Sequence, residues 1–318
     1  FLLHFAQTPQ PLGFSGAYFE AMSALTTTGS TVIVGLDHLP ASINMWRCFL
    51  QWLGGMGILV LAVAILPLLG GGGSQLFRAE ATGPMKDSKL TPRITETAKG
   101  LWTVYCLLSV ACLLAYRWGG MTWLDAWAHM FTTLSLGGLS THDASFGFFN
   151  SPLLEWIAIV FMLLASCNFA LYFVALVKRQ PLKVLRDPEW RASIGLLVGV
   201  SLMIAALLWF KGHSADLADI IRMSLFNVIS IGSTTGYATV DYTQWPVFAP
   251  IVMIMLSGVA TSAGSTGAGI KMARLVILVK QARREMRAII HPRAVQPVTL
   301  AGHPVDNRTI FSVLWWPV

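Results

Sequence analysis

The feature that most constrains this chain is a set of long apolar blocks that no charged residue interrupts. Residues 48–69, 100–116 and 156–177 contain no Asp, Glu, His, Lys or Arg. About 20 apolar residues are enough for a helix to cross the hydrocarbon core of a membrane. Only 12% of the 318 residues are charged, whereas soluble domains usually carry about 25%. We therefore predict an all-α polytopic membrane protein, and the lack of Asp, Glu, His, Lys and Arg in these blocks predicts no enzyme and no catalytic residue.

One unit of span, short helix, glycine-containing loop and span recurs three times, with a period of about 100 residues. The second copy comprises 100–118, 123–134, 135–142 and 153–177. The third comprises 193–210, 217–231, 232–240 and 247–280. The first starts at its short helix and comprises 15–25, 26–31 and 46–69. Because the short helices are about half as long as a span, we predict three re-entrant segments that line a shared aqueous pore.

The three loops align without gaps, and one alignment column is glycine in all three. TTTGST at 26–31, SLGGLST at 135–141 and STTGYAT at 233–239 superimpose on Gly29, Gly138 and Gly236. A filter for a monovalent cation needs backbone carbonyls turned inward, and glycine reaches the positive φ angles this requires at little cost. Simple turns between helices would also use Gly and Thr, but three copies in register after half-spans favour the filter.

A second cluster of small residues, SGVATSAGSTGAGIK at 257–271, interrupts the last long block. Each glycine inside a helix costs about 1 kcal/mol, so the helix is predicted to open there. Two alternatives are a phosphate-binding P-loop, whose lysine would be displaced by one position, and small residues that ease helix packing. The favoured interpretation is an intramembrane gating loop beneath the filter. Its residues are Gly258, Ala263, Gly264, Ser265, Thr266, Gly267 and Gly269.

Basic residues mark one side of the membrane. Three stretches hold 17 of the 22 Lys and Arg residues, namely 70–99, 178–192 and 271–293. Cytoplasmic loops are enriched in these residues, so we expect these stretches to be cytoplasmic and the filter to face the periplasm or exterior. The loop side has a net charge of −4, which would attract cations modestly. The formal charge of +7 is thus a topology signal, and we expect contact with the lipid bilayer and no nucleic acid. His142 and Asp143 are expected to hydrogen-bond their own loop locally.

Several motifs resemble the TrkH branch of the Trk/Ktr/HKT potassium-transporter superfamily. They are the three loops, WRCFLQWLGGMGILVLAVAILPLL at 46–69, GGLSTHDASFG at 137–147 and ATSAGSTGAGIK at 260–271. The resemblance implies M1-P-M2 pore repeats with re-entrant loops, four around one pore, similar to a single-chain potassium channel. It also implies a homodimer in the bacterial inner membrane and a cytoplasmic nucleotide-binding regulatory subunit of TrkA type. The chain is expected to be a fragment that lacks the N-terminal helices, the first M1 and the fourth repeat.

The resemblance also assigns site residues and an ion. The potassium-coordinating backbone falls on Thr27, Thr28, Gly29, Leu136, Gly137, Gly138, Thr234, Thr235 and Gly236. Potassium is the expected transported ion, with no organic cofactor. A sodium-permeable protein, or an ion-coupled secondary transporter with a broken helix at the membrane midplane, is the alternative.

The expected organisation follows the repeats. The pore repeats are assigned to 1–70, 100–178 and 193–282, the cytoplasmic linkers to 71–99 and 179–192, and a cytoplasmic segment with the start of a further helix to 283–318.

Overall fold

The computed structural model describes residues 12–65, 94–177, 182–212, 216–262, 264–269, 271–290, 299–300 and 303–304. In chain order its helices are α2 (Phe14–Leu25), η1 (Leu36–His38), α3 (Ala41–Ile65), α5 (Ile94–Trp118), α6 (Trp123–Leu134), η3 (Ser145–Phe149), α7 (Pro152–Ala165), α8 (Phe169–Val177), α9 (Leu182–Arg186), α10 (Pro188–Phe210), α11 (Leu217–Gly232), η4 (Tyr242–Gln244), α12 (Phe248–Ser257) and α13 (Met272–Ile290). Strands β1 (Thr299–Leu300) and β2 (His303–Pro304) form one antiparallel pair. Apart from this pair, the described regular structure is helical, as predicted.

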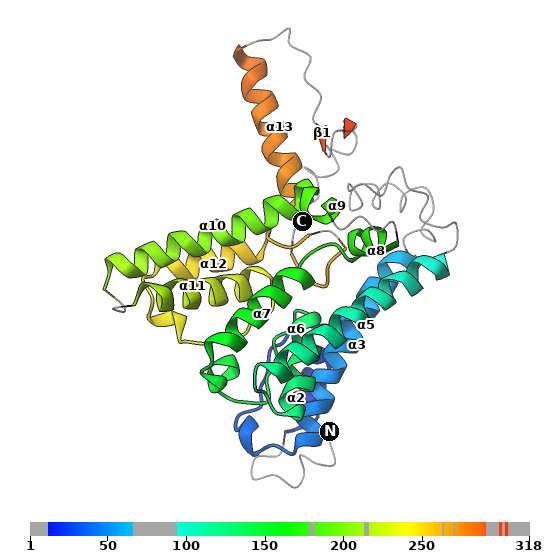
Figure 1. The fold of residues 1–318 in the computed structure, drawn as a ribbon, viewed down its shortest axis with the longest axis vertical. Helices are drawn as coiled ribbons and strands as arrows, with labels where there is room; N and C mark the ends of the chain where they lie inside the picture. The colour runs from blue at the N-terminus through cyan, green and yellow to red at the C-terminus, as the bar shows by residue number, and fades with distance from the viewer. Residues whose placement is uncertain are drawn as a thin grey trace.

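The helices repeat the three-copy pattern of the sequence. The short helices α2, α6 and α11 each lead into a glycine loop, and the predicted half-span at 123–134 coincides with α6. Within the copies, α5 packs on α6 and α10 on α11. Between copies, α3 packs on α6, and α7 packs on α11 in the same relation. Figure 1 shows α10, α11 and α12 side by side on one flank, with α3 and α5 on the other and α7 between them.

Side-chain caps fix where helices of the second and third copies begin. Thr122 precedes α6, and its hydroxyl oxygen accepts the backbone N–H of Asp125 at 3.1 Å while donating to that residue's carboxylate at 2.7 Å. Asp187 and Asp216 cap α10 and α11 by accepting N–H groups of the first turn. Such caps satisfy donors that have no partner inside the helix. Local sequence thereby fixes the N-terminal ends of these helices, and the glycine loops follow the C-terminal ends of α6 and α11.

Two of the predicted spans are broken, one as expected and one not. The block at 247–280 opens between Ser257 and Met272, where α12 ends and α13 begins, as its glycines predicted. The block at 153–177 was predicted as one span, and this is wrong, because α7 and α8 meet at a bend of 89°. Among the described residues, two helical stretches are long and apolar enough to cross a membrane, Ala98–Trp118 and Pro188–Phe210, and the bent pair would make a third.

A continuous apolar core joins the copies, while the outer surface of the long helices is also apolar. Large hydrophobic side chains exposed on α5 and α10 include Leu107, Leu114, Leu202 and Phe210. Exposed apolar faces of this kind are suited to contact with lipid chains. Of the predicted segments, most of the linker at 71–99 and most of the segment at 283–318 lie outside the described residues.

Candidate ion-binding site

The three glycine loops, 26–31, 135–141 and 233–239, adopt one repeated backbone conformation. Gly29, Gly138 and Gly236 have φ angles of 77°, 68° and 91°. The sequence predicted these positive values. Two residues earlier, non-glycine residues are also left-handed, namely Thr27, Leu136 and Thr234, with φ of 57°, 53° and 65°. This second strained position costs about 1–2 kcal/mol per residue and was not predicted. Its recurrence in all three loops points to a functional requirement on carbonyl direction.

Backbone N–H groups in each loop point back to the helix that precedes it. In the second loop, the amides of Gly137 and Gly138 both donate to Thr132 O, at 3.0 and 3.4 Å. The same pairs of bonds end on Ser23 O in the first loop and on Ser230 O in the third. With the N–H groups used in this way, the carbonyls turn away from the helix. Within the described part of the chain, the predicted coordinating carbonyls accept no hydrogen bond, apart from that of Gly137.

Where two loops meet, a glycine of one loop lies against a backbone carbonyl oxygen of the next. A Cβ atom on Gly29 would lie 1.8 Å from Gly137 O, and one on Gly138 would lie 2.0 Å from Thr235 O. These two junctions are equivalent, because each joins a loop glycine to the residue before the glycine of the next loop. The third glycine, Gly236, has no neighbour within 4 Å of such a Cβ. The three described loops therefore follow one another around a common axis. The position beside Gly236, where the next loop would stand, is not filled by any described residue.

A buried polar residue stands nine positions before each loop glycine. Glu20, His129 and Asn227 occupy these positions and are completely buried. Each side chain bonds to the hydroxyl of a residue two or three positions after the loop glycine. The partners are Thr31 at 2.6 Å, Ser140 at 3.0 Å and Thr239 at 2.9 Å, respectively. Sequence reasoning missed these residues, although the alignment of the loops places them in register.

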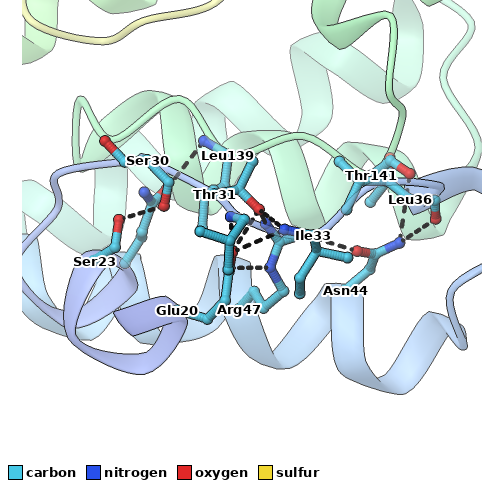
Figure 2. Close-up of polar contacts among 12 residues, drawn as sticks. Glu20, Ser23, Ser30, Thr31, Ile33, Leu36, Asn44, Arg47, Leu139 and Thr141 are labelled. Carbon is cyan, nitrogen blue, oxygen red and sulfur yellow. Dashed lines mark hydrogen bonds and ion pairs between the residues drawn. The ribbon is translucent and has the colours of Figure 1, made fainter. Parts of the chain in front are cut away.

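The first of these anchors is a buried ion pair. Arg47, at the start of α3, donates from Nε to Glu20 Oε2 at 3.1 Å, and both side chains have zero exposure. The other Glu20 oxygen accepts from the Thr31 hydroxyl and from the backbone N–H of Val32, each at 2.6 Å (Figure 2). A further guanidinium nitrogen reaches Asn44 Oδ1 at 3.1 Å. The segment leaving the first loop is thus held by charge-assisted bonds on both sides.

Side chains from neighbouring elements tie the loops together. Gln51 on α3 donates to Gly137 O at 3.0 Å and accepts from the N–H of Leu139 at 3.3 Å, so it braces the second loop from the first copy. Tyr237, which follows the third loop glycine, is fully buried and its hydroxyl bonds Thr132 and Thr133 on α6. These contacts join the third copy to the second. The loops are therefore cross-braced as well as anchored.

The outer ends of the first two loops are also joined. His142 bonds Asp37 through Nδ1, and Asp143 Oδ1 accepts the N–H of Gly35 at 3.0 Å. The predicted local bonding is present, since the backbone N–H of His142 donates to Ser140 Oγ at 3.2 Å. The bonds to the preceding copy were not predicted. The hydrogen bond from His142 lowers the pKa of Asp37, against a smaller opposing effect of burial.

The acidic residues of the loop side divide into structural and exposed groups. Glu20 pairs with Arg47, and Glu155 on α7 pairs with Arg222 on α11 at 2.9 Å. The carboxylates exposed to solvent on this side are those of Asp37, Asp143, Asp216, Asp219 and Asp241. The attraction of cations that the sequence suggested therefore rests mainly on five of the eight acidic residues of this side.

The connection between α12 and α13, residues 258–271, lies directly against the glycine loops. The Thr266 hydroxyl donates to Leu134 O at 3.1 Å, at the end of α6. The N–H of Ala268 donates to the hydroxyl of Thr234, in the third loop, at 3.1 Å. Gly264 and Gly269 have positive φ angles of 74° and 95°, so the chain turns back on itself. Of the predicted gating residues, Ala263 lies outside the described residues.

Comparisons with known proteins agree on one family. The family model TrkH, described as a cation transport protein, matches residues 2–316. The Trk system potassium uptake protein TrkH of Vibrio parahaemolyticus is 47% identical over 305 residues, which are 95% of this chain and 63% of the relative. That of Escherichia coli K12 is 45% identical, over 98% of this chain and 64% of the relative.

A solved structure gives the same result. The crystal structure of the potassium transporter TrkH from Vibrio parahaemolyticus superimposes with a TM-score of 0.85 and 42% identity, covering 96% of this chain and 62% of that one. The chain thus spans less than two thirds of the length of these relatives. The agreement confirms the all-α, channel-like fold class and the prediction that the chain is not an enzyme. The chain belongs to the TrkH family of cation transport proteins.

Proposed function

We propose that this chain forms most of a pathway for potassium uptake across the bacterial inner membrane. The observation that carries the proposal is the repeated loop backbone, in which left-handed residues turn carbonyls to the junctions between loops. Rings of carbonyls can replace the hydration shell of K⁺. The coordinating residues are Thr27, Thr28, Gly29, Leu136, Gly137, Gly138, Thr234, Thr235 and Gly236. The names of the relatives support potassium as the transported ion.

A fourth loop would complete the proposed filter. The junctions at Gly29 and Gly138 repeat one relation, and the same relation applied at Gly236 predicts a carbonyl where the described residues place no atom. Four carbonyls around an axis match the coordination that K⁺ receives in channels. We propose that a further repeat of the complete protein supplies this loop.

The 258–271 connection is the proposed gate. Its hydrogen bonds to Leu134 O and Thr234 place it at the ends of the pore helices, beside the loops. Small residues with few bulky contacts permit more than one arrangement of such a segment. In the arrangement described, we propose that it obstructs the pathway beneath the filter.

Orientation, organisation and partners follow from charge and from the repeats. We propose that the filter faces the periplasm or exterior, with the basic helix α13 on the cytoplasmic side, where Figure 1 shows it projecting from the helix bundle. A basic helix there could contact anionic lipid, a partner subunit of TrkA type, or both, in a homodimer. The proposed pore repeats remain 1–70, 100–178 and 193–282.

Flux through the complete protein in liposomes tests the proposal. We expect Rb⁺ uptake that external K⁺ inhibits strongly and Na⁺ weakly, because carbonyl rings favour the larger ions over Na⁺. Equal inhibition by Na⁺ would indicate the sodium-permeable alternative, and uptake that requires a proton or sodium gradient would indicate a coupled transporter. Absence of Rb⁺ uptake by folded protein would contradict the proposal.

A further inference from the structure

The bend between α7 and α8 has no proline or glycine to explain it. Sharp helix kinks usually occur at proline, at glycine–serine pairs or at inserted groups. Residues 162–177 contain neither proline nor glycine, yet the two helices meet at 89°. Hydrogen bonds to another part of the chain help to hold the bend.

Those contacts come from the 258–271 connection. Ser166 O accepts the N–H of Ser262 at 3.1 Å, and the N–H of Phe169 donates to Gly264 O at 3.1 Å. Each of the two breaks thus supplies the hydrogen-bond partners that the other break has lost. In a membrane interior, where water is scarce, a freed backbone group costs several kcal/mol. Neither break can release the other without replacing these bonds.

Asn168 keeps the carbonyl of Ser166 and the N–H of Phe169 free to bond the 258–271 connection. Its side-chain Oδ1 accepts the N–H of Ala170 at 2.9 Å, as an N-cap for α8. In a continuous helix that N–H would instead bond Ser166 O, and the N–H of Phe169 would bond Ala165 O. Straightening α7 and α8 would therefore satisfy these groups internally and free Ser262 and Gly264. The Asn168 side chain also lies against Gly264, where a Cβ atom would be 2.9 Å from Oδ1.

We propose that the α7–α8 break is the second half of the gate, in which Asn168 holds the bend and the bend holds the 258–271 connection beneath the filter. This inference rests on the proposed function. It makes Asn168 a positioning residue, since it has no contact with the proposed ion pathway carbonyls. When the gate opens, α7 and α8 straighten and the 258–271 connection is released. The gate therefore has two discrete arrangements.

The test compares Asn168→Ala with Asn168→Ser in the complete protein. Alanine removes the cap and favours a continuous helix, whereas serine retains an N-cap oxygen. We expect Asn168→Ala to raise Rb⁺ flux per folded protein about fivefold, the equilibrium shift that loss of a typical cap produces, with the Rb⁺/Na⁺ ratio unchanged. Asn168→Ser should stay near the wild-type flux. A protein with Ser262–Gly267 deleted shows the flux expected when the connection no longer obstructs the pathway, and this flux should also exceed that of wild type.

The outcomes separate this inference from the function beneath it. If wild-type protein shows no K⁺-sensitive Rb⁺ flux, the proposed function fails. If wild type is selective and the deletion raises flux, but Asn168→Ala conducts like wild type, the second half of the gate is refuted while the function stands.

A cysteine pair keeps the inference testable if Asn168→Ala does not fold. Ser166 and Ser262 are joined by a backbone hydrogen bond, so Ser166→Cys with Ser262→Cys, in a Cys167→Ser background, would lock the two breaks together. We expect oxidation to suppress flux and reduction to restore it. Equal flux in the oxidised and reduced states, with the disulfide verified by mass spectrometry, would refute the coupling.

Discussion

Replacing Gly138 by alanine is expected to abolish selective Rb⁺ uptake by the complete protein. The residue has φ of 68°, which costs a non-glycine residue about 1–2 kcal/mol. The larger effect is steric, because the new Cβ would lie 2.0 Å from Thr235 O. That oxygen is a proposed ligand, so the clash displaces the coordinating backbone itself. Competition of Na⁺ with Rb⁺ in liposomes measures the loss.

Two further glycines sharpen this prediction. Gly120 has φ of 105° and no atom within 4 Å of a built Cβ, so Gly120→Ala imposes backbone strain without a clash and should leave selectivity intact. Gly236→Ala tests the fourth loop. A neighbouring carbonyl in the complete protein would make it as damaging as Gly138→Ala, whereas an open position would leave it milder. Selective uptake by Gly138→Ala would contradict the filter assignment.

Replacing Arg47 by leucine is expected to destabilise the protein by about 3–5 kcal/mol, because it leaves Glu20 buried and without its ion pair. The guanidinium also donates to Thr31 Oγ1 at 2.9 Å, so the segment leaving the first loop loses two restraints. Thermal unfolding followed by size-exclusion chromatography in detergent reports the change. We expect little folded protein at temperatures that wild type survives.

A matched pair and a double variant provide the controls. Asp219 pairs with Arg222 at 2.8 Å but is 45% exposed, and removal of such a pair usually costs less than about 1 kcal/mol. Asp219→Asn should therefore unfold near the wild-type temperature. Glu20→Gln combined with Arg47→Leu should recover part of the lost stability, since no buried charge remains unpaired. A double variant no more stable than Arg47→Leu alone would show that the ion pair is not the cause.

Much of the fold was accessible from local sequence signals. Apolar block length gave the long helices, the half-spans gave α2, α6 and α11, and glycine density gave the opening between α12 and α13. The positive φ angles of the loop glycines were also predicted, because glycine is the residue that adopts them cheaply. These features depend on neighbours in the chain, so the pattern of residues carries them.

The remaining features depend on contacts between distant segments. Ser166 to Asn168 contain no proline or glycine, and their break depends on bonds from Ser262 and Gly264 together with the Asn168 cap. The left-handed Leu136 is likewise imposed by its place between a helix end and a packed loop. The pairing of Glu20 with Arg47 could have been suspected, because a charge beside an apolar block needs a partner, but the sequence does not identify which one.

The most direct test of the account is the position of Rb⁺ in a crystal structure of the complete protein grown in rubidium salt. Anomalous scattering locates the ion without assumption about its ligands. We predict peaks on the axis shared by the three glycine loops, in contact with the carbonyls of residues 27–29, 136–138 and 234–236. Peaks confined to the 258–271 connection or to the outer carboxylates, with none at the loops, would contradict the account.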